Sequence, residues 1–225
     1  MGSLLLLFTE LAGLFFLSRL LIQKLYAFFL LLFRARSAAV SAVTLLLFPG
    51  TVIHELSHLF TAEILGVRTG KLTLAPESIR EVNIKTGSVA IAQTGPFRRA
   101  AIGLSPIFAG ILSLAALSWW IPQLIEHSNS YLLLLTSYLL FAISNSMFSS
   151  REDLKGFWPL AITLSLFIGA AYAIGLRIGL EGKVLEVATT ILSSLVQSLG
   201  LVLAVNGVLL LTLHVLLVLT RKLLR

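Results

Sequence analysis

The sequence predicts an all-α polytopic membrane protein with about six transmembrane helices and a small β-hairpin or sheet inserted after one of them. Of the 225 residues, 57% are hydrophobic and only 12% are charged, whereas a soluble domain carries about a quarter charged residues. Several apolar runs reach the roughly 20 residues that a helix needs to cross a bilayer. One stretch between two of these runs alternates apolar and polar residues instead, as strands do. The chain is therefore expected to fold in a lipid bilayer.

Six apolar segments are expected to form the membrane helices. They are residues 3–33, 38–65, 99–121, 131–148, 157–177 and about 196–220. The first is longer than one upright span needs and contains Arg19, Gln23 and Lys24, which favours one span followed by an interfacial amphipathic stretch. No small-residue cleavage site follows it, so a retained anchor is favoured over a signal peptide. Residues 183–198 are expected to form an interfacial lead-in to the last helix, and small residues such as Gly103 permit close helix packing.

Residues 67–96 break the helical pattern. The segments KLTLA (71–75) and SVAIAQ (88–93) alternate apolar and polar residues in the manner of strands. Turn-forming residues interrupt the stretch at Gly70, Pro76, Gly87 and Gly95-Pro96. This pattern predicts a small hairpin or sheet between two membrane helices, with a plain solvent loop as the alternative.

The sequence HELSH at residues 54–58 lies within the apolar segment 38–65. Residues four apart share one face of a helix, so His54 and His58 project together. Two imidazoles at this spacing can bind one Zn²⁺, with Glu55 beside them as the general base for water. Ionisable residues within a membrane are rare and usually functional. A zinc site is therefore favoured over histidines that only satisfy hydrogen bonds in the core.

The net charge of +7 is attributed to membrane topology rather than to a nucleic-acid partner, because most basic residues flank the apolar runs. On the side where the HELSH helix ends lie Arg68, Lys71, Arg80, Lys85, Arg98, Arg99, Arg151, Lys155, Arg221, Lys222 and Arg225. The other side receives Arg34, Arg36, Arg177 and Lys183. The positive-inside rule then makes the first side cytoplasmic. We expect an integral, multi-pass protein of a prokaryotic cytoplasmic membrane, with its active site toward the cytoplasm.

A catalytic zinc ion needs a third protein ligand and keeps an open position for water. Asp153 is the only aspartate in the chain, and it follows the 131–148 segment on the membrane side where the HELSH helix ends. It is therefore the favoured third ligand. Glu152 is the alternative beside it, and Glu77 and Glu81 in the β segment are further alternatives.

Four features together resemble the site-2 protease family of intramembrane zinc metalloproteases. They are HELSH in a membrane helix, a short β element, Gly95-Pro96 at the start of the next helix, and Asn145 followed by Asp153. The second signature of that family runs Asn-x-x-Pro-x-x-x-Leu-Asp-Gly, and Asn145 and Asp153 keep its eight-residue separation. Where the family has proline, leucine and glycine, this chain has Phe148, Glu152 and Leu154. A shifted register would put Lys155 at the ligand position, so the asparagine-based register is favoured because it supplies a carboxylate.

The resemblance also implies how the chain is organised. A catalytic core of three helices covers residues 38–156 and carries the β insertion at about 67–96. Residues 1–37 form an N-terminal membrane helix with an interfacial segment, and residues 157–225 form C-terminal membrane helices. No PDZ module is apparent in the sequence, so the chain resembles a minimal, divergent member of the family.

In the implied site, His54, His58 and Asp153 hold Zn²⁺, and Glu55 activates water. Asn145 hydrogen-bonds the substrate backbone or the developing oxyanion. The implied activity is that of a zinc metalloendopeptidase, which hydrolyses transmembrane or signal-peptide-like protein substrates near the cytoplasmic face. A strand of the β insertion would pair with an unwound segment of the substrate.

Two other classes of function are compatible with a metal site in a membrane protein. The first is a non-proteolytic zinc-binding membrane scaffold or pseudo-protease, which the imperfect second signature favours. The second is a metal-ion transporter. A transporter would need several acids or histidines spread along a pore, and this chain gathers its candidates at one end of the helices.

Overall fold

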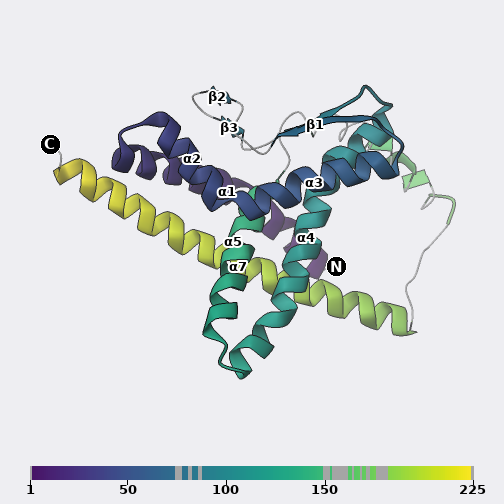
Figure 1. Ribbon diagram of the computed structural model, residues 1–225. Coiled ribbons are helices and arrows are strands. Elements are labelled where there is room, and N and C mark those ends of the chain that lie inside the picture. Colours follow the sequence, from purple (N-terminus) through teal and green to yellow (C-terminus); the bar gives the residue numbers. More distant parts are fainter. Residues whose placement is uncertain are drawn as a thin grey trace.

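The computed structural model describes residues 2–73, 78–80, 83–85, 88–148, 153, 162–163, 165–167, 169–170, 173–175 and 182–223. Most of the described chain is helical (Figure 1). The helices are α1 (Gly2–Phe33), α2 (Arg36–Leu46), α3 (Phe48–Ile64), α4 (Pro96–Glu126), α5 (Ser130–Ser146) and α7 (Gly182–Leu223). Between α3 and α4 lie β1 (Thr69–Thr73), β2 (Ser78–Arg80), β3 (Asn83–Lys85) and β4 (Ser88–Ile91). A largely helical fold with a β insertion is thus confirmed.

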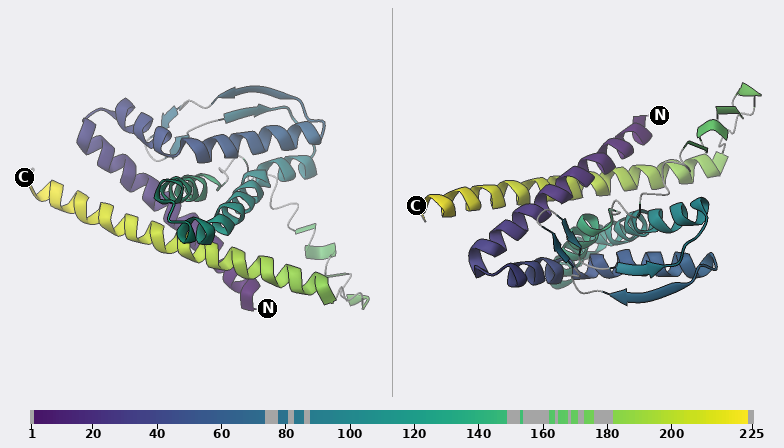
Figure 2. Two further views of the ribbon diagram at one scale, coloured as in Figure 1. Left: turned by 60° about the horizontal axis from the view of Figure 1, so that its bottom comes forward. Right: turned by 90° about the horizontal axis from the view of Figure 1, so that it is seen from above.

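The strands form two antiparallel pairs. Leu72 of β1 lies opposite Val89 of β4, and Ile79 of β2 lies opposite Ile84 of β3. β1 and β4 contact α3 and run alongside it (Figures 1 and 2). These two strands overlap the alternating segments KLTLA and SVAIAQ, so the sheet is confirmed and the alternative of a plain loop is wrong.

Three helical segments are long and apolar enough to cross a membrane, namely α1, α4 and Leu185–Thr220 of α7. The helices α2 and α3 meet this test only as a pair, and they are bent by 73° relative to each other. α5 is an apolar helix of 17 residues, slightly shorter than a full span. The described residues thus contain three spans, or up to four, by length and composition. The predicted number of about six is not confirmed, and most of the predicted span 157–177 lies outside the described residues.

The prediction of one helix over residues 38–65 is wrong, because the chain bends at Leu47. Leu47 has φ −98° and ψ 5°, and Pro49 follows in the first turn of α3. Proline has no N–H, and its ring conflicts with the carbonyl four positions earlier, so it tends to kink or break a helix. The Tyr138 hydroxyl on α5 donates a hydrogen bond of 3.1 Å to the carbonyl of Leu46 at the bend.

The two stretches that the sequence favours as interfacial are not separate elements but parts of long helices. α1 continues unbroken through Arg19, Gln23 and Lys24, and α7 continues through residues 183–198. Both are single long helices.

α1 and α7 lie side by side and run in the same direction (Figure 2). Gly13 of α1 faces Leu203 of α7, and the Nζ atom of Lys24 lies 3.4 Å from Nδ1 of His214. At the second contact the two residues are 190 apart in number, and the first contact has the same offset. Because the residue of α7 is numbered 190 higher than its partner in α1 at both contacts, residue numbers rise in the same direction along the two helices, and the helices are parallel.

The hydrophobic core joins the helices around α5. α4 and α5 form a hairpin, and α3 packs across its open end (Figure 1). The main cluster draws on α1, α4, α5 and α7 and consists of Leu14, Leu114, Leu140, Ile143, Met147, Leu199 and Val202. A smaller cluster ties α2 to α1 through Leu21, Leu25, Val43 and Leu47.

Gly50, near the start of α3, lets this helix approach α5 closely. A Cβ added at Gly50 would overlap the carbonyl of Ala142 and lie 2.8 Å from the Cβ of Ser146. Because backbone atoms obstruct it, Gly50→Ala is expected to lower the free energy of unfolding by about 1–3 kcal/mol. Unfolding of the purified protein in detergent measures the loss. Gly207→Ala on α7 is the matched control, since nothing lies within 4 Å of the added Cβ. Equal stability of Gly50→Ala and the wild type would contradict this close approach.

Candidate metal centre

The helix α3 carries both histidines of the HELSH motif, and its local sequence defines both of its ends. Pro49 stands in the first turn, where its missing N–H leaves no helical hydrogen bond unmade. Gly66 follows the last turn with a φ of 66°. The N–H groups of Gly66 and Val67 bond back to carbonyls of that turn, which is the Schellman arrangement for ending a helix. Between these ends, His54 and His58 share one face of α3, with ring centroids 4.9 Å apart.

Each histidine is oriented by a backbone carbonyl of a different helix. His54 donates from Nδ1 to the carbonyl of Ser146, the last residue of α5, at 2.8 Å. His58 donates from Nδ1 to the carbonyl of Ile102 in α4, also at 2.8 Å. A carbonyl oxygen can only accept, so the proton of each neutral imidazole is on Nδ1 and the lone pair is on Nε2. This is the tautomer in which a histidine can bind a metal through Nε2.

Asp153 brings its carboxylate to the two Nε2 atoms. Oδ1 lies 3.6 Å from Nε2 of His58, and Oδ2 lies 3.9 Å from Nε2 of His54. The three side chains offer ligand atoms that all lie within 4.8 Å of one another. A tetrahedral zinc ion with bonds of 2.0–2.2 Å keeps its ligands roughly 3.3 Å apart. His54, His58 and Asp153 therefore lie close enough to bind a metal ion.

The electrostatics of this group favour a cation at its centre. The side chains of His54, His58 and Asp153 are 12%, 5% and 20% exposed, so water screens them only in part. Two lone pairs on nitrogen and a carboxylate facing one another repel unless a positive charge lies between them. A metal ion supplies this charge while leaving both Nδ1 protons in their hydrogen bonds to carbonyls.

Two consecutive residues of α4, Ile102 and Gly103, help to position the candidate ligands. The carbonyl of Ile102 receives the His58 proton. At the next position, a Cβ added to Gly103 would overlap the carbonyl oxygen of Asp153 and lie 2.9 Å from its carbonyl carbon. The absence of a side chain at Gly103 is therefore what lets the backbone of Asp153 come this close to α4.

Glu55, the predicted general base, is buried beside the ligands, with 6% of its surface exposed. It directly follows His54 in α3 and precedes His58 by three residues, which is a neighbouring position on a helix surface. The Ser57 hydroxyl donates to the carbonyl of His54 at 2.6 Å, and the Ser105 hydroxyl donates to that of Ile102 at 2.7 Å. Such bonds satisfy polar groups that would otherwise be costly to bury here.

Asn145 lies one residue before Ser146 and is 4% exposed. Its Nδ2 atom donates to the carbonyl of Phe141 at 2.8 Å and to Oδ1 of Asn206 on α7 at 3.1 Å. Both amide hydrogens are thus used within the protein. The contact of Asn145 with a substrate or oxyanion stays a prediction.

The other acidic candidates for the third ligand, Glu152, Glu77 and Glu81, lie outside the described residues, as does Lys155. The sequence did not reveal the carbonyls of Ser146 and Ile102, because any residue type supplies a carbonyl. Gly103 was visible only as a small residue for helix packing, and its proximity to Asp153 depends on the tertiary structure.

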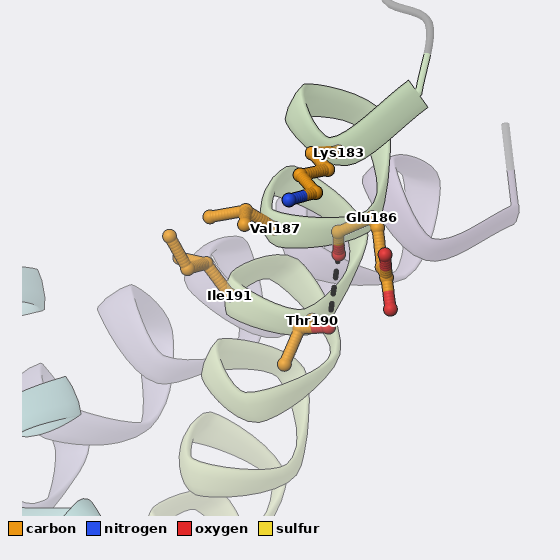
Figure 3. Close-up of a pocket in the computed structure, with 5 residues that line it drawn as sticks. All are labelled: Lys183, Glu186, Val187, Thr190 and Ile191. Carbon is orange, nitrogen blue, oxygen red and sulfur yellow. Dashed lines mark hydrogen bonds between the residues drawn. The ribbon is translucent and has the colours of Figure 1, made fainter.

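A hollow of about 350 Å³ lies on α7 and is lined by Lys183, Glu186, Val187, Thr190 and Ile191 (Figure 3). The Thr190 hydroxyl donates to the carbonyl of Glu186 within the helix at 2.9 Å. All the lining residues are exposed side chains of this one helix. The hollow contains none of the candidate metal ligands and is a surface feature separate from them.

Three long apolar helices and the His-His-Asp group together describe a protein compatible with a membrane location and able to bind a metal ion. In comparisons with known proteins, no family model, no curated protein and no solved structure matches this chain.

Proposed function

We propose that this protein is an intramembrane zinc metalloprotease that hydrolyses peptide bonds of membrane-embedded substrates near the cytoplasmic face. The observation that carries the proposal is the convergence of the His54 and His58 Nε2 atoms on the Asp153 carboxylate, with Glu55 buried beside them. The residues are those that make the chain resemble the site-2 protease family.

The donor set supports zinc as the metal. Two imidazole nitrogens and one carboxylate oxygen form the ligand set of hydrolytic zinc sites, which keep a further position open. The chain has no cysteine, so it offers none of the thiolate ligands that structural zinc sites commonly use. When bound, zinc supplies a Lewis acid that polarises a carbonyl group and makes water nucleophilic near neutral pH.

The residues of the chain have separate tasks in the proposed reaction. The carbonyls of Ser146 and Ile102 hold the two histidines in the binding tautomer. Glu55 accepts a proton from the attacking water and passes it to the leaving amine as the peptide bond breaks. Its burial keeps it from exchanging that proton freely with bulk solvent.

The apolar helices and the β insertion support a membrane-embedded protein substrate. The long helices expose large hydrophobic side chains along their length, as expected of surfaces that face lipid. Each strand of the β1–β4 pair has one edge outside the pair, and such an edge can take up an extended transmembrane or signal-peptide-like segment. Extension exposes a peptide bond that a helix would shield. The basic residues that flank the helices favour a cytoplasmic orientation of the site in a prokaryotic membrane.

A non-proteolytic zinc-binding scaffold is the second candidate. It is favoured by the engagement of Asn145 with Asn206, which uses the donors that would otherwise face a substrate. The scaffold is also favoured by Phe148 and Leu154, which stand at positions where the family has proline and glycine.

Glu55→Gln separates the two candidates. In a protease, the variant is expected to keep its zinc and to lose about 10²–10⁴-fold in activity, the usual contribution of a general base. Zinc content is measured by elemental analysis, and cleavage is measured on tagged single-span peptides in liposomes. Glu63→Gln is the matched control, because Glu63 is an exposed residue of the same helix. A zinc-loaded wild type that cleaves none of the peptides, or a Glu55→Gln variant as active as the wild type, would contradict the protease.

A further inference from the structure

A pair of buried amides links α7 to the end of α5. Asn145 Nδ2 donates to Asn206 Oδ1 at 3.1 Å, and Asn206 Nδ2 donates to Asn145 Oδ1 at 3.3 Å. The two side chains are 4% and 0% exposed. Each buried amide therefore satisfies the other, and burying an amide without a partner is strongly unfavourable.

The surroundings of Asn206 make this bond directional. Asn206 lies in the apolar sequence VLAVNGVLLL of α7. Hydrophobic contacts, such as those of Leu199 and Val202 with the core, have no preferred direction. A reciprocal pair of hydrogen bonds requires one distance and one orientation. The pair thus fixes where the last turn of α5 lies relative to α7.

The last turn of α5 is also the turn that orients His54. The final carbonyls of a helix have no partner within the helix, so the carbonyl of Ser146 is available to the Nδ1 proton of His54. Asn145 immediately precedes Ser146. A displacement of Asn145 therefore moves the carbonyl that sets the direction of the His54 ring.

We propose that Asn206 is a positioning residue of the metal centre. It acts through Asn145 and the Ser146 carbonyl to direct Nε2 of His54 toward Asp153. The inference rests on the metal site of the proposed function but not on proteolysis. It gives Asn145 a role in holding the ligands in place, in addition to the predicted contact with a substrate.

Binding of Co²⁺ and Zn²⁺ to the purified full chain in detergent tests the proposal. Asn206→Leu leaves the Asn145 amide without its partner and is expected to weaken metal affinity about tenfold, at the lower end of the 10–100-fold range for groups that orient a ligand. The visible absorption of bound Co²⁺ is expected to change, because the His54 ring is turned. Asn206→Asp is expected to behave as the wild type, since a carboxyl protonated in apolar surroundings can still donate and accept.

The double variant Asn145→Leu/Asn206→Leu distinguishes positioning from stability. It leaves no buried amide unsatisfied, so its stability is expected to recover toward that of the wild type. Its metal affinity is expected to stay about tenfold low, because the directional link is gone. This variant also serves if Asn206→Leu does not fold. Val202→Ala, a buried α7 position in the hydrophobic core, is the control for loosened packing.

Three results would overturn the inference. They are wild-type affinity and Co²⁺ absorption in Asn206→Leu, recovery of affinity together with stability in the double variant, and an equal loss of affinity in Val202→Ala. Peptide cleavage does not enter the measurement. A wild type that binds metal without cleaving peptides would therefore refute the protease and leave the positioning role of Asn206 to be decided by these affinities.

Discussion

Asp153→Ala is expected to purify with little or no zinc, whereas the wild type carries about one equivalent. The carboxylate is the only anionic member of the His54–His58–Asp153 group, and without it two neutral imidazoles remain. The loss of affinity is expected to exceed the 10–100-fold that follows removal of a group which only orients a ligand. Elemental analysis and a competition titration with a chelator measure it. Peptide hydrolysis, if present in the wild type, is expected to vanish with the metal.

Glu152→Ala is the matched control for this experiment, because it removes a neighbouring carboxylate that the sequence left as an alternative ligand. It is expected to retain zinc. Zinc that persists in Asp153→Ala but disappears in Glu152→Ala would show that the metal binds in another arrangement. Loss of the metal from both variants would indicate that the substitutions alter the local conformation of the chain around Asp153, and would not identify either residue as the ligand.

Gly103→Ala is expected to disable the site although no ligand is removed. The added methyl group would overlap the carbonyl of Asp153, and backbone atoms cannot turn aside as a flexible side chain would. Asp153 must then move away from α4 and from the two Nε2 atoms. A displacement of about 1 Å at a reacting centre can reduce a rate about 10²-fold. In the proposed protease a loss of this size is expected in peptide hydrolysis, and zinc binding is expected to be weaker.

The control for Gly103→Ala must separate its effect from the general effect of adding a methyl group to a membrane helix. Gly207→Ala serves this purpose, since the added Cβ meets nothing within 4 Å, and it is expected to leave zinc affinity unchanged. Wild-type zinc affinity in Gly103→Ala would mean that Asp153 does not lie against α4 as the structure describes.

Features that depend on short-range sequence could be predicted. The spacing of His54 and His58 places two imidazoles on one helical face wherever the helix lies, and this pairing is observed. Alternating residues and glycines likewise indicated the β insertion. Pro49 and Gly50 indicated a loosened or kinked helix within the apolar run 38–65, but local sequence did not indicate that the chain would divide there into two helices bent by 73°.

Features that depend on distant contacts could not be predicted. Asn206 is an isolated polar residue in an apolar helix, and nothing in its neighbours indicates that its partner is Asn145, 61 residues away. The carbonyls of Ser146 and Ile102 depend on how α4 and α5 pack against α3. A helical pattern specifies which residues share a face, but it does not specify which helix covers that face.

The parallel course of α1 and α7 constrains how the chain is threaded through the bilayer. If both cross it in the same direction, the segments between them must make an odd number of passes. α4, the shorter apolar helix α5 and the predicted span 157–177 would supply three. With these three counted as passes, the bent α2–α3 pair would add none and would enter and leave by the same face, as a re-entrant hairpin.

This threading also changes the charge balance expected from the sequence. Arg34, between α1 and α2, and Arg36, the first residue of α2, would then lie on the face that is expected to carry most of the basic residues. Arg177 and Lys183 alone remain on the opposite face. With this threading the asymmetry of positive charge would be stronger, and Gly2 and Leu223 would lie on opposite sides of the bilayer.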